Sequence, residues 1–240
     1  MSKIPIPEQY NSLPVVVAEK MRELDRRATQ EYGISPESLM ENAGRAVAEE
    51  FLKVCIPALA GSPGDIKAVI CCGRGNNGGD GLVAGRYLRQ AGAAVEAFML
   101  SPKKETGFAG LVAINLEKAR EKGVDIFFME ESGLTRLESL LASCTAVLDA
   151  LLGTGSAGKP EGAMKRVIQV MNRSGRPIAA IDIPSGLQPD TGHHSGVFIK
   201  ARWTFTLGLV KRGLLAPHAA PNVGELKVLD IGYPAELVRR

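Results

Sequence analysis

The sequence lacks long apolar runs and long runs of charge of one sign. No stretch of about 18 apolar residues could span a bilayer, and the N-terminal MSKIPIPEQYNSLP has no apolar core typical of a signal peptide. The 29 Lys and Arg residues nearly balance 26 Asp and Glu residues, giving a net charge of +3. We therefore expect a cytoplasmic protein without membrane or nucleic-acid partners. An organellar origin with a trimmed transit peptide stays open.

Cysteine is also scarce. Cys55, Cys71, Cys72 and Cys144 lie in apolar surroundings, with no CxxC pair and no histidine nearby. This pattern argues against a zinc site and against a disulfide framework. We expect four buried thiols in a reducing compartment.

Helical and strand-like segments alternate behind two leading helices, predicted over 17–33 and 36–54. Strands are expected at 66–72, 94–100, 124–129, 145–151, 177–182, 201–207 and 225–231, and further helices at 80–91, 107–122, 134–142 and 161–173. Strands that are apolar almost throughout indicate a mostly parallel sheet covered on both faces. The prediction is a three-layer, Rossmann-like α/β/α domain with a doubly wound sheet, formed by residues 1–240 as one unit.

Four polar loops follow strands of this sheet. They are 73–81 (GRGNNGGDG), 149–155 (DALLGTG), 182–186 (DIPSG) and 208–213, which contains Lys211. In doubly wound sheets, ligands bind at the carboxyl ends of the strands where the strand order reverses. We therefore expect these loops to converge on one ligand site.

The first loop fits the dinucleotide fingerprint GxGxxG, which is weak evidence alone. A hydride-transferring dehydrogenase also needs an acid at the end of the second strand, but Glu96 lies mid-strand. A Walker loop is excluded because Pro160 follows Gly158 and Lys159. What remains is a glycine-rich turn into a helix N-terminus, which suits an anion such as pyrophosphate. A tight turn needing positive φ would explain the glycines but not the neighbouring Asn76, Asn77 and Asp80.

Asp149 and Asp182 both close apolar strands, where a carboxylate must be solvated, paired or functional. Either residue alone is explained equally well as a cap or as an acceptor that braces a loop. Two on one sheet edge favour a shared ligand. Asp149, Asn77 and Ser185 offer only hard oxygen donors, which suit a hard cation better than zinc. Asp182 is then free for acid or base work.

Four motifs in order, GRGNNGGDGLVAGRYL, VLDALLGTG, AIDIPSGLQPDTG and TFTLGLVKRGLLAP…GELKVLDIGYP, resemble those of the YjeF N-terminal domain family of NAD(P)H-hydrate epimerases. The resemblance covers essentially the whole chain, including the leading helices with SLMENAG. It implies interconversion of the R and S forms of hydrated NADH and NADPH at C6, with Asp182 as the acid or base.

The resemblance also implies ligand residues. The substrate would contact Asp182 and two loops, represented here by Asn76, Asn77, Gly78, Gly79 and Asp80, and by Gly153, Thr154, Gly155, Ser156, Ala157, Gly158 and Lys159. A potassium ion would be held by Asn77, Asp149 and Ser185. One departure concerns the second loop, where many relatives carry an arginine soon after GTG, whereas this chain has Lys159 and Lys165.

Two further implications concern partners. The family's dehydration activity resides in a separate ribokinase-like domain, so we expect another chain to act as the NAD(P)HX dehydratase, and family members commonly form homodimers. The rival hypothesis is a non-catalytic binding or scaffold module on the same fold. We favour the enzyme because degenerate scaffold copies are expected to lose the strand-end carboxylates or the NNGGD loop, both of which are present.

Overall fold

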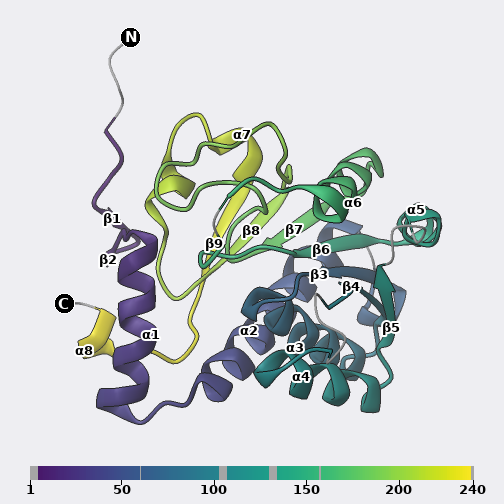
Figure 1. The fold of residues 1–240 in the computed structure, drawn as a ribbon, viewed down its shortest axis with the longest axis horizontal. Coiled ribbons are helices and arrows are strands. Elements are labelled where there is room, and N and C mark those ends of the chain that lie inside the picture. The colour runs from purple at the N-terminus through teal and green to yellow at the C-terminus, as the bar shows by residue number, and fades with distance from the viewer. Residues whose placement is uncertain (1–4, 60, 103–106, 130–133, 157, 239–240) are drawn as a thin grey trace.

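The computed structural model describes residues 5–59, 61–102, 107–129, 134–156 and 158–238. Its main sheet contains β3 (Lys67–Cys72), β4 (Ala94–Leu100), β5 (Asp125–Met129), β6 (Ala146–Ala150), β7 (Ile178–Ile181), β8 (Trp203–Leu207) and β9 (Glu225–Leu229). The strand order is β5-β4-β3-β6-β7-β8-β9, and every neighbouring pair is parallel. The order reverses between β3 and β6, which confirms the predicted doubly wound sheet (Figure 1).

Helices cover both faces of the sheet. They are α1 (Ala18–Tyr32), α2 (Pro36–Leu59), α3 (Asn76–Gln90), α4 (Gly110–Glu121), α5 (Leu134–Ser143) and α6 (Gly162–Arg173), followed by the short α7 (Ala220–Val223) and α8 (Ala235–Val238). Alternate side chains of β3 separate the layers, since Ile70 packs with the α1 to α4 side and Val69 packs with α5 and α6. The α/β/α architecture is therefore as predicted.

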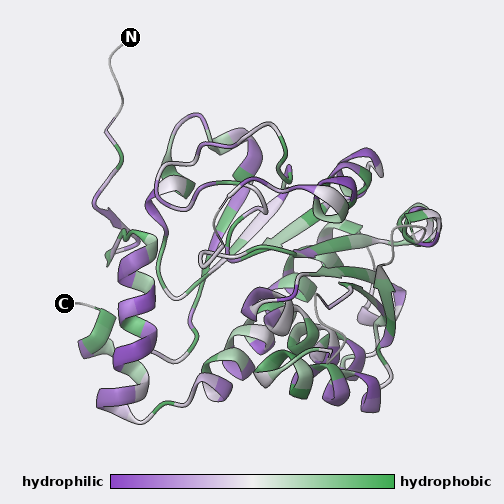
Figure 2. Ribbon diagram, viewed as in Figure 1, coloured by the Kyte–Doolittle hydropathy of each residue, from purple (hydrophilic) through white to green (hydrophobic). Residues whose placement is uncertain are grey.

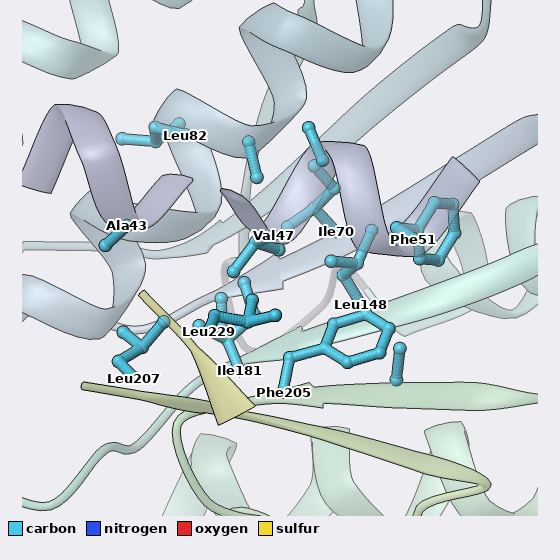
Figure 3. Packing of buried hydrophobic residues seen from close by; sticks show 14 of the residues in the cluster. Ala43, Val47, Phe51, Ile70, Leu82, Leu148, Ile181, Phe205, Leu207 and Leu229 are labelled. Atoms are coloured by element: carbon cyan, nitrogen blue, oxygen red, sulfur yellow. The ribbon is translucent and has the colours of Figure 1, made fainter. Parts of the chain in front are cut away.

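The larger core lies between α2 and the sheet. Val47 and Phe51 of α2 pack against Ile70 of β3, Leu148 of β6 and Phe205 of β8 (Figure 3). Hydrophilic residues lie mostly on helix surfaces such as that of α1, whereas the central strands are largely hydrophobic (Figure 2). Trp203 and the four free cysteines are buried as well, which confirms the expected packing thiols.

Several boundaries differ from the sequence prediction. Helix α3 begins at Asn76 rather than at residue 80, α2 continues to Leu59, and α4 begins at Gly110 rather than at 107. Short elements were not anticipated: the hairpin of β1 (Gln9–Tyr10) and β2 (Leu13–Pro14), the 3-10 turns Pro63–Asp65 and Arg212–Leu215, and helices α7 and α8. Such elements are too short to establish a hydrophobic period in the sequence. No helix among the described residues is long and apolar enough to cross a membrane.

Candidate active site

The NNGGD segment forms the first turn of α3, directly after β3. Its glycines permit close packing rather than positive φ, because none of Gly75, Gly78 and Gly79 has a positive φ angle. A Cβ on Gly78 would lie 2.1 Å from the Gly73 carbonyl oxygen, which no side chain could accommodate. The helix therefore presses its N-terminal turn onto the end of β3. The N-terminus of α3 therefore lies at the carboxyl edge of the sheet, where its helix dipole favours an anion.

Asp149 lies within β6, one residue before the strand ends, and its carboxylate joins the loop after β7. Its Oδ1 accepts a 2.6 Å hydrogen bond from Ser185 Oγ, and its Oδ2 accepts a 2.8 Å bond from Ser185 N. Both residues are fully buried. Burial raises the pKa of Asp149 to about 6, although the bonds from Ser185 and Leu151 oppose the shift. Asp149 and Ser185 therefore contact each other at this edge, and their role as potassium ligands stays a prediction.

Asn77, in the first turn of α3, is buried at 8% exposure, and neither Oδ1 nor Nδ2 has a hydrogen-bond partner. A Cβ on Gly153 would lie 3.2 Å from both Cβ and Cγ of Asn77 and 3.0 Å from Asp182 Oδ2. Asn77 therefore sits across Gly153 from Asp182. A buried amide without partners is costly, and such a group in a native site calls for a bound ligand or ion.

Asp182 is the first residue after β7 and adopts a left-handed φ of +70°, which aspartate tolerates better than most residues. Its Oδ2 accepts bonds from Thr154 N at 2.7 Å and Thr154 Oγ1 at 2.6 Å. Its Oδ1 lies 2.5 Å from Lys211 Nζ. Burial alone would raise the pKa of Asp182, but Lys211 and Thr154 outweigh it and lower that pKa. Asp182 is therefore held as a carboxylate.

Lys211 also belongs to this site, because it pairs with Asp182. The sequence pattern places it in the loop after β8 but predicts no role for it. Its side chain is 1% exposed, and its Nζ also donates to Thr206 Oγ1 at 3.2 Å and to the Leu207 carbonyl at 2.7 Å. A signal existed in the sequence, since Lys211 stands in the apolar stretch TFTLGLVKRGLL. Lysine is almost never fully buried unless it is paired.

Three further ionisable groups lie near the pair of Asp182 and Lys211. Burial, with the charges of Asp182 and Asp25, raises the pKa of Asp80 in α3. Tyr233 donates a hydrogen bond to Asp25 of α1, and a Cβ on Gly208 would lie 2.7 Å from the Tyr233 ring. Burial and the charge of Asp25 raise the pKa of Tyr233. Sequence reasoning missed Asp25 and Tyr233, because nothing in their local pattern shows that segments 208 residues apart meet.

The remaining predicted substrate contacts line the same edge but differ in exposure. Gly79 and Thr154 are buried, Ser156 is half-buried, and Asn76, Gly155, Gly158 and Lys159 are exposed. Ala157 lies outside the described residues. Lys165, also noted in the sequence, is exposed on α6.

The fold and these loops define a Rossmann-like domain with a polar, partly orphaned site at its switch point. Residues 36–213 match the model of the family described as "YjeF-related protein N-terminus". The chain therefore belongs to the YjeF-related protein N-terminus family.

Individual relatives extend this finding. The chain is 39% identical over 228 residues to the NAD(P)H-hydrate epimerase of Elusimicrobium minutum, covering 95% of this chain and 100% of that protein. It is 39% identical to the bifunctional NAD(P)H-hydrate repair enzyme Nnr of Thermofilum pendens, covering 94% of this chain but only 41% of that longer protein. The crystal structure of yeast ynu0 superposes with a TM-score of 0.77 at 22% identity, covering 90% of this chain and 88% of that one. The yeast structure thus shares the fold.

Proposed function

We propose that this protein is an NAD(P)H-hydrate epimerase, which interconverts the R and S forms of hydrated NADH and NADPH. The proposal is supported by its match to the entire length of the E. minutum epimerase. The observation that carries it is the buried Asp182 carboxylate at the switch point, beside the unpartnered Asn77. A scaffold module would have no need for either costly feature.

In this proposal the hydrated nucleotide lies across the carboxyl edge of the sheet. Its anionic pyrophosphate would face the N-terminal turn of α3, where the helix dipole favours negative charge. Gly153 and Thr154, which lie beside Asp182 Oδ2, would cover the reacting ring. Exposed Lys159 adds a positive charge near the phosphates, in place of the arginine of other family members.

The same edge fits a potassium ion held by Asn77, Asp149 and Ser185. The Asn77 Oδ1 lacks a partner, and the other two donors are a carboxylate and a hydroxyl. All three donor atoms are oxygens, and only the Asp149 carboxylate carries a charge. Such a set suits a monovalent ion better than a divalent one. When bound, the ion would supply positive charge that orders the loops after β3, β6 and β7.

Asp182 is then the proton-transfer group. A candidate acid or base must lie within hydrogen-bond reach of the reacting hydroxyl, and Asp182 lies at the edge where the substrate ring would sit. The bifunctional relatives combine two repair activities in longer chains, so we further propose that a separate dehydratase consumes the S epimer and that the protein acts as a homodimer.

Epimer resolution by chromatography tests the activity directly. One pure epimer of hydrated NADH is incubated with the protein, and the approach to the equilibrium ratio is followed. We expect relaxation much faster than in buffer alone. A ratio that relaxes at the rate of the buffer control would contradict the proposal.

The cation is tested separately by soaking crystals in a thallium or rubidium salt. We expect an anomalous peak between Asn77, Asp149 and Ser185. A water at hydrogen-bond distances of about 2.8 Å in that position would contradict the assignment. Asn77→Leu should abolish the peak.

A further inference from the structure

The two oxygens of Asp182 differ in their capacity to accept a proton. A carboxylate offers roughly four acceptor positions, two on each oxygen. Thr154 N and Thr154 Oγ1 fill both positions on Oδ2, whereas Oδ1 accepts only from Lys211. Oδ1 is therefore the atom with an open lone pair, and the Asp182 side chain is 11% exposed.

Lys211 is fixed in place by its contacts. Its three N–H groups have three acceptors: Asp182 Oδ1, Thr206 Oγ1 and the Leu207 carbonyl. The other charged or ionisable groups facing this pair are Asp80 from α3, Asp25 from α1 and Tyr233 before α8. No second cation from the described segments opposes these acids, so Lys211 alone balances Asp182.

We propose that Lys211 is a positioning residue that holds Asp182 as a carboxylate, so that Asp182 Oδ1 removes the proton of the C6 hydroxyl and epimerisation proceeds by ring opening. This inference rests on the proposed epimerase activity. It selects between two paths that the residue types alone leave open.

The step balances without any further reactant. Oδ1 takes the hydroxyl proton, the C6 to oxygen bond becomes a carbonyl, and the bond between C6 and N1 breaks. The electron pair of that bond goes to N1, where conjugation with the ring carboxamide delocalises it, and Asp182 Oδ1 passes the proton to N1. Rotation about the bond between C5 and C6 presents the other aldehyde face. Attack by N1, with the proton returned to oxygen, gives the opposite epimer.

The competing path loses water from C6 and adds it back. That path needs a proton donor at the hydroxyl, and Asp182 is held in the opposite state by three donors. The two paths differ in the fate of the C6 oxygen. Ring opening keeps it, whereas loss and addition of water replace it with solvent oxygen.

An isotope experiment on the unmodified protein separates them. One pure epimer of hydrated NADH is incubated with the protein in water enriched in oxygen-18, and the reaction is quenched early. Mass spectrometry then measures the oxygen-18 content of the product epimer. A parallel sample without protein corrects for spontaneous exchange. We expect little or no label in the product. One labelled oxygen per epimerisation would overturn the inference but leave the proposed function intact, whereas absence of any epimerisation would overturn both.

The role of Lys211 is tested by the pH profile of kcat/KM. Without the ammonium, the buried Asp182 should take up a proton at higher pH, so in Lys211→Met the acidic limb should move upward by about 1 to 3 pH units. Lys211→Arg keeps the charge, so its acidic limb should stay at the wild-type position even if turnover falls. Lys53→Met, on the exposed surface of α2, is the matched control and should leave the profile unchanged.

A limb that does not move in Lys211→Met would overturn the positioning role. A purely structural lysine would instead lower activity equally at every pH and reduce the melting temperature. If Lys211→Met fails to fold, the isotope experiment still decides the path, because it uses the wild-type protein.

Discussion

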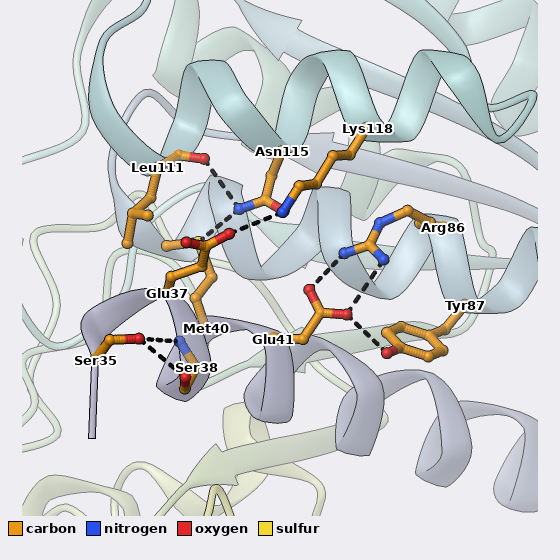
Figure 4. A network of polar contacts seen from close by, with 10 residues as sticks. All are labelled: Ser35, Glu37, Ser38, Met40, Glu41, Arg86, Tyr87, Leu111, Asn115 and Lys118. Atoms are coloured by element: carbon orange, nitrogen blue, oxygen red, sulfur yellow. Dashed lines mark hydrogen bonds and ion pairs between the residues drawn. The ribbon is translucent and has the colours of Figure 1, made fainter. Parts of the chain in front are cut away.

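The molecule contains two arrangements of carboxylates and cations in contrasting environments. At the sheet edge, Asp182 and Lys211 are 11% and 1% exposed and belong to loops after β7 and β8. On the helical face, Glu41 binds Arg86 and Tyr87, and Glu37 binds Lys118 (Figure 4). The helical groups bridge α2 to α3 and α4, and their side chains are 10% to 51% exposed.

A cleft among the described residues lies at the helical arrangement. Its volume is about 480 Å³, and its lining includes Glu41, Arg86 and Lys118 but none of the predicted site residues. The shape of this cleft therefore does not point to the residues predicted from the sequence. The distinguishing property of the sheet edge is charge held away from water next to an amide without partners, a costly arrangement that packing does not require.

The largest expected effect concerns the buried pair. Asp182→Asn leaves the Lys211 charge unpaired, so we expect it to destabilise the fold by about 3 to 5 kcal/mol and to lower turnover by about 10² or more. Adding Lys211→Met removes the stranded charge and should restore much of the stability but none of the turnover. Thermal unfolding and single-turnover epimerisation on the same preparations measure both quantities.

Acid titration sharpens this first comparison. The folded pKa of Asp182 lies below its ordinary value, so the pair stabilises the protein above that ordinary value. The contribution is lost as pH falls through the folded pKa. The difference in unfolding free energy between the wild type and the double variant should therefore fall only below about pH 4. A difference that persists unchanged to pH 2 would contradict the assignment.

An intermediate effect is expected at the helical face. Glu41 Oε2 lies 2.6 Å from Arg86 Nη2, and Oε1 accepts a 2.7 Å bond from Tyr87. Glu41→Gln weakens these bonds, so we expect a loss of about 1 to 3 kcal/mol in unfolding free energy. Epimerisation should keep its wild-type rate at temperatures where the variant is folded. A large drop in kcat with normal melting would mean that this face belongs to the reaction.

The smallest effect is expected for the exposed pair of Glu37 and Lys118. Their contact is 2.8 Å long, but both side chains are more than 40% exposed. Lys118→Met should change the unfolding free energy by less than about 1 kcal/mol, because water and salt screen such pairs. Denaturant unfolding in low and in 1 M salt measures the difference, which should vanish at high salt. A loss of unfolding free energy that does not depend on salt would contradict the view that this is a screened surface ion pair.

The sheet and its layers were predictable because long apolar strands and amphipathic helices have strong periods. The start of α3 was not, since four residues, Asn76 to Gly79, have low helix propensity. Tertiary contact reverses that preference: Gly79 packs under Met40 of α2, where a Cβ would lie 2.7 Å from Met40 Sδ. Local propensity describes the isolated chain, and here packing decides.

At the site, residues at or shortly after a strand end could be placed from the sequence, because parallel strands end at one edge. Asp149, Asp182 and Ser185 were placed at this edge in this way, and their roles stay predictions. Lys211, which lowers the pKa of Asp182, was given no role, and Asp25 and Tyr233 were not singled out. Lys211 acts through contacts inside its loop, and Asp25 and Tyr233 arrive from the two ends of the described chain. Such contacts between distant segments form only in the folded chain, so no local sequence pattern predicts them.

The strand order also bears on how the protein folds. Five of the six strand pairs join strands that are neighbours in the sequence, and only β3 and β6 pair across two intervening strands. Closing that long connection costs more chain entropy than forming any other pair, and non-local contacts slow folding. The candidate active site spans this junction, because it combines residues at the ends of β3 and β6 with others after β7 and β8. If the site is catalytic as proposed, its assembly requires this most non-local step of sheet formation, and recovery of activity on refolding should follow closure of the two half-sheets.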